Sequence, residues 1–428
     1  MTTIGTAMGS GRPRLFYGWY LVIASWIMTF LMNAVTIGIF FKPMLVEFGY
    51  DRATLSAVQS IALIAYAIAS PFLGRLIDHF GPKRMIFICT GAQLLSRLFN
   101  GMASNIWHLY IARFLYEVRV MPASQVLVNR WFVKGRGSAL GILASSMPVG
   151  ALILPPLSQY LILQWTWRPT MLFWAAVTFA LMLPLALFIK DNPEEKGYGP
   201  DGKIDKNPPP ASAGATPSLK PKPGLALLEA LKTRTFWFQS TAHFICGIGC
   251  GFTQTHIVIF AIDMGYSDMI GASLLSIQGG VNLLGVLATG RLSDRIARGR
   301  VLALTHFIRS LSFATIILFV LLGGGSLWIL YLAMALFGFG WFTTSPLQAG
   351  LVADNFGSLQ MGTILSVIIS AHTLGWALGA YAGGIVFEMT GSYYGFFLVQ
   401  TCLELTAALL AFTIKQTKIP PAIDSGHS

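Results

Sequence analysis

Two ionisable residues of the first half lie inside a stretch that is otherwise apolar and have a spacing that suits chemistry. Arg113 and Glu117 are four residues apart, so on a helix they share a face and can pair. Glu117 is the only carboxylate well inside such a stretch in this half. We predict that Arg113 contacts an anionic substrate and that Glu117 carries a proton. The alternative is a structural ion pair that fixes the helix.

Further polar residues lie in the apolar stretches of both halves. Arg309 is a candidate cation for a substrate, and His256 and Asn33 are candidate hydrogen-bonding groups. The alternative for Arg309 and His256 is a solvated or lipid-facing end of a span, and for Asn33 it is a hydrogen bond between helices. Glu404 is expected to be peripheral structure.

No enzyme signature is present in the chain. It lacks a GxxxxGK[ST] phosphate loop, and its histidines and carboxylates are scattered. Cys246 and Cys250 share a helix face, but two thiols without further ligands make a poor metal site. We therefore expect small packing cysteines, no metal, no cofactor and no catalytic activity.

The elements that position these residues are predicted to be membrane-spanning helices. Apolar residues make up 54% of the 428 residues and charged residues only 11%, against about 25% charged in a soluble domain. A span takes roughly 20 apolar residues, and twelve stretches qualify, at 16–41, 53–74, 85–103, 106–128, 138–162, 169–190, 235–262, 268–290, 301–322, 327–350, 361–388 and 391–414. The prediction is an all-α membrane protein.

The placement of positive charge predicts the orientation of the chain. The net charge is +12, and Lys and Arg concentrate in every second loop, so both termini are expected in the cytoplasm. We interpret this charge as a contact with anionic membrane lipid and expect no nucleic-acid partner. The chain divides into a bundle at 1–190, a cytoplasmic linker at 191–234 and a second bundle at 235–428. The linker is Pro- and Lys-rich and is expected to be mobile, with an amphipathic helix at 225–235.

A repeated loop relates the two halves. The sequence Gly74-Arg75-Leu76-Ile77-Asp78 returns 216 residues later as Gly290-Arg291-Leu292-Ser293-Asp294. We expect Gly74 and Gly81 to permit tight turns. The residues predicted to lock and release the helices at the cytoplasmic side are Gly74, Asp78, Gly81, Lys83 and Arg84 in the first copy and Asp294 and Arg298 in the second.

The spacing G-x-x-x-D-x-x-G-x-K-R resembles the loop motif of the major facilitator superfamily. The segments 128–141, 191–197, 230–237 and 353–357 are similar to those of monocarboxylate porters and the oxalate:formate antiporter. This resemblance implies the major facilitator fold, with twelve transmembrane helices in two six-helix bundles that rock about a central cavity.

The resemblance also implies a cargo. His372 falls where the oxalate carrier has a substrate-binding lysine, and it can donate a hydrogen bond or, when protonated, act as a cation. We predict that it binds substrate and exchanges protons; a core histidine bonded to backbone is the alternative. The arginine that such carriers place on the eighth span is Val286 here, and Asn282 one turn earlier is the remaining candidate.

The resulting hypothesis is a proton-coupled secondary transporter of a small organic anion in a bacterial cytoplasmic (inner) membrane. The alternatives are a proton-driven exporter of a metabolite or drug and a substrate-sensing receptor. The sequence leaves the oligomeric state open.

Overall fold

The computed structural model describes residues 16–132, 136–196, 199, 224–357 and 359–414, apart from the side chains of residues 71, 74 and 78. In these ranges every regular element is helical, and one isolated bridge joins Gly224 to Gly357. Ten helices of the described part are long and apolar enough to cross a membrane. The predicted mobile linker lies largely outside the described residues.

The first half contains six helical units, several of them made of consecutive segments. In chain order they are α1 (Tyr17–Leu31) with η1 (Met32–Val35) and α2 (Ile37–Phe48), α3 (Arg52–Phe80), α4 (Pro82–Gly101), α5 (Ile106–Tyr116) with α6 (Met121–Trp131), α7 (Arg136–Trp165), and α8 (Trp167–Val177) with η2 (Thr178–Met182) and α9 (Leu183–Phe188).

The second half also contains six units, preceded by the short elements η3 (Pro193–Lys196) and α10 (Leu227–Ala230). The six are α11 (Arg234–Asp263), α12 (Asp268–Arg295), α13 (Arg298–Leu321), α14 (Leu327–Gly340) with α15 (Thr344–Phe356), α16 (Met361–Thr390) and α17 (Tyr394–Phe412).

Two of the expected twelve spans are not among the ten long apolar helices. The stretch at 85–103 corresponds to α4, whose Lys83, Arg84 and Arg97 lower its mean hydropathy. The stretch at 106–128 is interrupted between α5 and α6. With these two units the count is twelve, and the predicted fold class is confirmed.

Two local predictions differ from the structure. The predicted loop from Gly74 is instead helix, because α3 continues to Phe80 and ends at Gly81, whose φ is +81°. The expected tight turn at Gly74 is therefore wrong, whereas that at Gly81 is confirmed. The helix expected at 225–235 is only α10, because Thr233 accepts a hydrogen bond from the Phe236 amide and starts α11.

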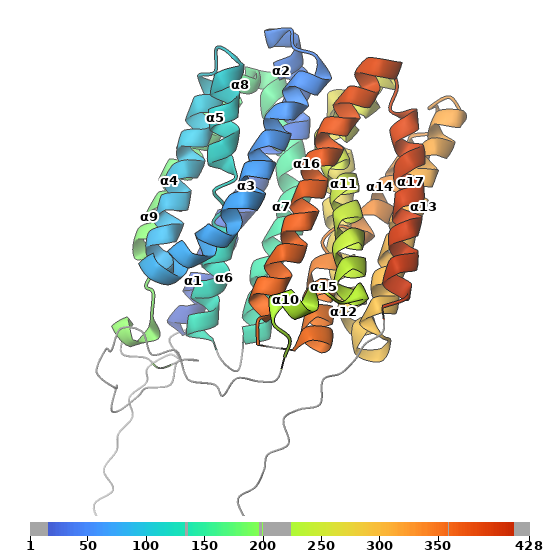
Figure 1. Cartoon of the computed structure of the whole chain (residues 1–428). Helices are drawn as coiled ribbons and strands as arrows, with labels where there is room; N and C mark the ends of the chain where they lie inside the picture. Colours follow the sequence, from blue (N-terminus) through green and yellow to red (C-terminus); the bar gives the residue numbers. More distant parts are fainter. Residues whose placement is uncertain (1–15, 133–135, 197–198, 200–223, 358, 415–428) are drawn as a thin grey trace, which may run out of the picture.

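The halves stand side by side, with α3 along α16, α7 along α12 and α2 along α11 (Figure 1). We call the end that carries Tyr17 and Phe412 the terminal end, and the end that carries Gly49–Asp51 the distal end. Inside the second half α11 packs closely on α16 through glycines. A Cβ at Gly379 would lie 1.9 Å from the Ile248 carbonyl oxygen, so only glycine permits this approach.

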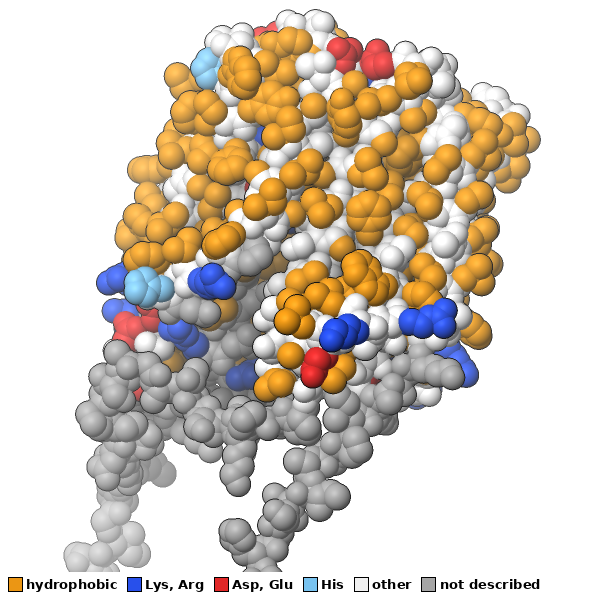
Figure 2. Space-filling model, viewed as in Figure 1, with side chains coloured by type: hydrophobic (Ala, Val, Ile, Leu, Met, Phe, Trp, Pro, Cys, Tyr) orange, Lys and Arg blue, Asp and Glu red, His pale blue; other side chains and the backbone are white. Residues whose placement is uncertain are grey.

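The surface matches a membrane environment. Figure 2 shows hydrophobic side chains over the middle of the molecule and Lys and Arg gathered at the lower, terminal end. Large apolar side chains such as Ile68, Phe87, Val399 and Leu409 are exposed on the membrane-spanning helices, as lipid contact requires.

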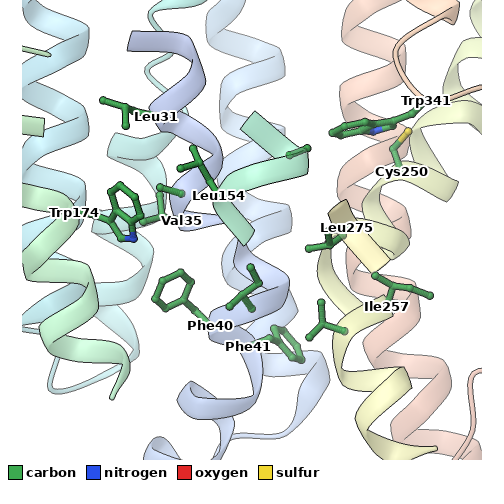
Figure 3. Close-up of a cluster of buried hydrophobic side chains, with 14 of the residues drawn as sticks. Leu31, Val35, Phe40, Phe41, Leu154, Trp174, Cys250, Ile257, Leu275 and Trp341 are labelled. Atoms are coloured by element: carbon green, nitrogen blue, oxygen red, sulfur yellow. The ribbon is translucent and has the colours of Figure 1, made fainter. Parts of the chain in front are cut away.

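One buried apolar cluster extends through both halves. Figure 3 shows Phe41 of α2 directed toward the second-half helices that carry Ile257 and Leu275. Phe41 also meets the His256 ring edge-on, with 5.3 Å between centroids. The halves therefore share a packed apolar contact toward the distal end.

Candidate functional site

Two helices are interrupted at equivalent places in the two halves. The fourth unit breaks at 117–120, between α5 and α6, and the tenth unit, which is the fourth of its half, breaks at 341–343, between α14 and α15. Pro122 follows the first break, and Gly338 and Gly340 precede the second. Broken helices within a membrane occur where the backbone is covered by protein or lines a cavity, and in transporters they mark substrate sites.

The first break holds a carboxylate between two guanidinium groups. An oxygen of Glu117 lies 3.0 Å from Arg113, as the i,i+4 spacing predicted. The Nε of Arg119 donates to the other oxygen at 2.9 Å. Helical spacing does not predict Arg119 as a partner of Glu117, because the two residues are only two positions apart.

The two arginines differ in surroundings. Arg113 lies 4.2 Å from the centroid of the Tyr116 ring and lines a small cavity with Phe40 and Asn100. About 20 Å³ is accessible there, which is room for one water molecule. Arg119 lies over Tyr66 at 5.0 Å, and its side chain is 31% exposed against 12% for Arg113. Arg119 is thus the more accessible cation.

A third arginine of this half is buried without a carboxylate. Arg97 is 1% exposed, and its guanidinium donates to the Gln93 backbone oxygen at 3.0 Å and to the Leu31 oxygen at 3.2 Å. Among the described residues no carboxylate contacts it. Among the side chains that the structure describes, the interior of the first half therefore holds three guanidinium groups, at Arg97, Arg113 and Arg119, against the one carboxylate of Glu117.

The buried Arg309 and Glu404 of the second half balance each other's charge. Arg309 Nε donates to Glu404 at 2.9 Å, and His306 Nδ1 lies 2.8 Å from the other carboxylate oxygen. All three side chains are fully buried. The peripheral position expected for Glu404 is wrong, and so is the solvated or lipid-facing alternative for Arg309. A signal was available: Arg309 and Glu404 are opposite charges within apolar spans of one half, where such residues pair.

Three of the predicted substrate-binding residues have local partners. His256 is fully buried, with Nε2 2.8 Å from the Ala380 oxygen and Nδ1 3.1 Å from the Tyr393 hydroxyl, so it does not lie at a solvated span end. Asn282 donates to the Gly338 oxygen at 2.9 Å, just before the break in the tenth unit. Asn33 lies in η1 and contacts the Phe30 oxygen at 3.5 Å.

His372 lies against a second imidazole. Its ring centroid is 4.5 Å from that of His243 on α11 and 5.8 Å from the Trp376 ring. His372 is half-buried and His243 is buried. Residue spacing does not indicate His243, because the contact joins spans that are distant in the chain.

The repeated motif occupies the terminal end. Gly81 separates α3 from α4, and the Lys83 amide donates to Asp191 at 2.7 Å, so Asp191 supplies a carboxylate to the start of α4. Arg84 is exposed, and the side chain of Asp78 lies outside the described residues.

In the second copy of the motif, Arg298 forms an ion pair. It opens α13 and pairs with Asp354 of α15 at 2.6 Å. Asp294 is exposed in the last turn of α12. The second copy therefore joins α13 to α15 through a residue that follows the repeated Asp.

Polar contacts between the halves gather toward the distal end. Arg52 of α3 binds both oxygens of Asp263 on α11, at 2.6 and 2.8 Å, and its amide donates to Glu388 at 2.9 Å. Lys42 pairs with Asp268 at 2.8 Å. These five acidic and basic residues hold the distal ends of the halves together in this conformation.

Twelve helical units in two related halves, with equivalent units interrupted and charged side chains buried in each half, define a membrane transporter of the two-bundle type. The chain belongs to the Major Facilitator Superfamily, whose profile it matches over residues 21–380. It is an integral membrane protein that transports a small molecule.

Individual relatives match this chain over more than nine-tenths of its length. It is 26% identical to the uncharacterized MFS-type transporter YcxA of Bacillus subtilis, over 91% of this chain and 92% of that protein. It is 22% identical to monocarboxylate transporter 13 of Bos taurus, over 93% and 89%. A bacterial homolog of the human lysosomal transporter Spinster, solved in an inward-facing and occupied conformation, has the same fold, with a TM-score of 0.68 and 16% identity over 96% of this chain and 100% of that one.

Proposed function

We propose that the protein carries a small organic anion, a carboxylate, across the membrane together with a proton. The observation that carries the proposal is that the described interior of the first half holds three guanidinium groups and one carboxylate. Uncompensated charge within a membrane is costly and is kept for function. An anionic cargo supplies the missing negative charge. The monocarboxylate transporters among the relatives support the same class of cargo.

Glu117 provides a means of coupling the anion to a proton. While ionised, Glu117 forms ion pairs with both Arg113 and Arg119. A proton on Glu117 removes that negative charge and frees both guanidinium groups for a substrate carboxylate. Proton and anion therefore bind together more favourably than either binds alone, which is the thermodynamic requirement for symport. Glu117 is assigned this role in preference to His372, whose neighbours are another imidazole and a thiol.

The anion is placed near the break of the fourth unit, within reach of Arg119. Tyr66, over which Arg119 lies, is 14 residues from the start of α3 at Arg52, or about 21 Å along the helix. The cluster thus lies near the middle of the bundle, where a site is reachable from both sides in turn. The second-half contribution is assigned to Asn282, because its Nδ2 carries two hydrogens and the Gly338 oxygen, at 2.9 Å, takes only one of them.

Alternating access is assigned to the contacts at the two ends. The Arg52 and Lys42 pairs close the distal end, while Figure 2 shows the surface hollowed between the halves near the terminal end. The Lys and Arg at the terminal end support its assignment to the cytoplasm by the positive-inside rule. On this assignment both termini are cytoplasmic, the membrane is the bacterial inner membrane, and the conformation opens inward.

The terminal-end residues are proposed to close when the distal end opens. Gly81 gives the turn between α3 and α4, Asp191 binds the start of α4, and Arg298 joins α13 to α15. Asp78, Asp294 and their basic neighbours are assigned to the closed form. The proposed halves are residues 1–190 and 235–428, linked by 191–234.

The test is uptake of labelled mono- and dicarboxylates into proteoliposomes, with and without an imposed pH gradient. We expect uptake that rises when the outside is acidic. No flux of any carboxylate in either direction would refute the proposal; outward movement alone would indicate an exporter, and binding without flux a receptor.

A variant at Arg119 tests the site itself. Losing a hydrogen bond to a charged group costs about 1.5–3 kcal/mol, so R119Q should weaken apparent affinity roughly 10- to 100-fold, while R119K should retain more of it. R168Q is the matched control, because Arg168 pairs with Glu47 at 2.6 Å, away from the break. Equal effects of R119Q and R168Q would contradict the assignment.

A further inference from the structure

Three metal-binding side chains meet between α11 and α16. They are His243 and Cys246 of α11 and His372 of α16, and one donor atom of each lies within 4.8 Å of the other two. His243 and Cys246 are buried, and His372 is half-buried. The histidines are 9 and 11 residues from the terminal-end starts of their helices at Arg234 and Met361, so the cluster is roughly 14–17 Å deep.

The position of the cluster is fixed by the backbone. A Cβ at Gly247 would lie 2.1 Å from the His372 oxygen, and one at Gly375 would lie 2.0 Å from the Phe244 oxygen. Close approach at these glycines leaves the helices little freedom to separate. The two imidazoles are therefore held together, although a buried polar group is costly unless it has a partner.

One ring nitrogen of the cluster makes no other interaction among the described residues. His243 Nδ1 is buried and has no hydrogen-bond partner there. Cys246 Sγ lies 3.7 Å from the Thr344 hydroxyl and has side-chain contacts with Cys250 and His372. Buried polar atoms are nearly always satisfied, so an unpartnered imidazole nitrogen beside a thiol and a second imidazole indicates a ligand.

We propose that His243, Cys246 and His372 bind a transition-metal ion of the Zn²⁺ type. Two imidazoles and a thiolate are borderline-soft ligands that suit Zn²⁺ and Cu⁺ and disfavour Mg²⁺ and Ca²⁺. Three protein ligands leave a fourth tetrahedral position open, as in catalytic zinc sites. Binding requires the Cys246 thiol to lose its proton, which leaves to solvent.

Neighbouring charges are compatible with a bound cation. The Arg309 guanidinium donates to the Cys246 carbonyl oxygen at 2.8 Å and contacts Cys250 Sγ at 3.5 Å. Its own repulsion of a metal is offset because Glu404 neutralises it at 2.9 Å.

The geometry requires a small closure. Bonds of about 2.0–2.3 Å at tetrahedral angles place ligand atoms roughly 3.4–3.6 Å apart, whereas the present separations are at most 4.8 Å. Rotations of the three side chains that move each donor by about 1 Å are enough. The half-buried His372 gives the ion its entry.

The experiment uses the full-length purified protein in detergent, stripped of metal and titrated with Co²⁺ as a spectroscopic substitute for Zn²⁺. We expect a thiolate-to-cobalt charge-transfer band that saturates near one equivalent and is removed by Zn²⁺. C246S should abolish the band, and H372N should weaken Co²⁺ affinity by more than about tenfold.

The matched control is C402S, because Cys402 is an exposed cysteine on α17. It should leave the band unchanged. The proposal is overturned if the unaltered protein shows no band, if the band persists in C246S, or if it is lost in C402S instead. Gel filtration and circular dichroism check folding; should C246S not fold, H372N at the half-buried position decides the outcome by the same titration.

Discussion

Replacing Glu117 by Gln tests the proposed coupling, because the amide keeps the shape of the carboxyl group and imitates its protonated form. Glu117 has a side chain only 3% exposed and contacts both Arg113 and Arg119. At about 3 Å and an effective dielectric constant of about 20, Coulomb attraction is roughly 5 kcal/mol for each pair. The measured cost of removing one partner of a buried pair is about 3–5 kcal/mol, and this lower figure is preferred because it includes relaxation.

The expected result has a stability part and a transport part. Without substrate, E117Q should be less stable by about 3–5 kcal/mol, because two guanidinium groups lose their counter-charge. A bound anion restores that charge, so substrate should raise the thermal stability of E117Q more than that of the unaltered protein. In proteoliposomes E117Q should exchange labelled for unlabelled anion but should not accumulate it in response to a pH gradient.

The assays are thermal unfolding with and without substrate, counterflow, and uptake driven by a pH gradient. E194Q is the control, since Glu194 is an exposed carboxylate in η3. Accumulation by E117Q that follows the pH gradient as in the unaltered protein would refute the coupling. A substrate-induced stabilisation no larger than in E194Q would refute the competition between Glu117 and the anion.

Three further predictions concern the fold. R52Q removes the distal contact with α11. Because the pair is partly exposed, we expect its loss to cost about 1–2 kcal/mol, which is a 5- to 30-fold shift toward distal opening. Spin-label distances between the halves measure this shift, and an unchanged distance distribution would contradict the prediction. G379A places a Cβ 1.9 Å from an α11 carbonyl and should cost about 1–3 kcal/mol in thermal unfolding, whereas G395A, with open space around it, should not destabilise. The hydrogen bond from the Thr54 amide lowers the pKa of Asp51. The contribution of Asp51 to stability is therefore complete above the usual pKa of Asp and is lost as the pH falls through the lowered pKa. The difference in stability between the unaltered protein and D51A should vanish in acid, and a difference that persists there would contradict the prediction.

Much of the fold was predictable because it depends on local composition. The twelve apolar stretches and the repeated Gly74 motif determine twelve units in two halves, since lipid leaves a helix as the only way for such a stretch to satisfy its backbone. The pairing of Arg113 with Glu117 was likewise predictable from helical spacing. The break at 117–120 was not predicted, although the charged Glu117 and Arg119 within it and Pro122 just after it were a signal for it.

The sequence by itself determined the class of the protein, the order of its helices and which spans contain ionisable residues. Tertiary structure decided which of those residues meet. Glu404 neutralises Arg309 across α13 and α17, so the excess positive charge remains in the first half alone. His243 reaches His372 only because glycines let α11 and α16 approach. Contacts between distant helices depend on crossing geometry and close packing, and neither is encoded in the periodicity of a single span.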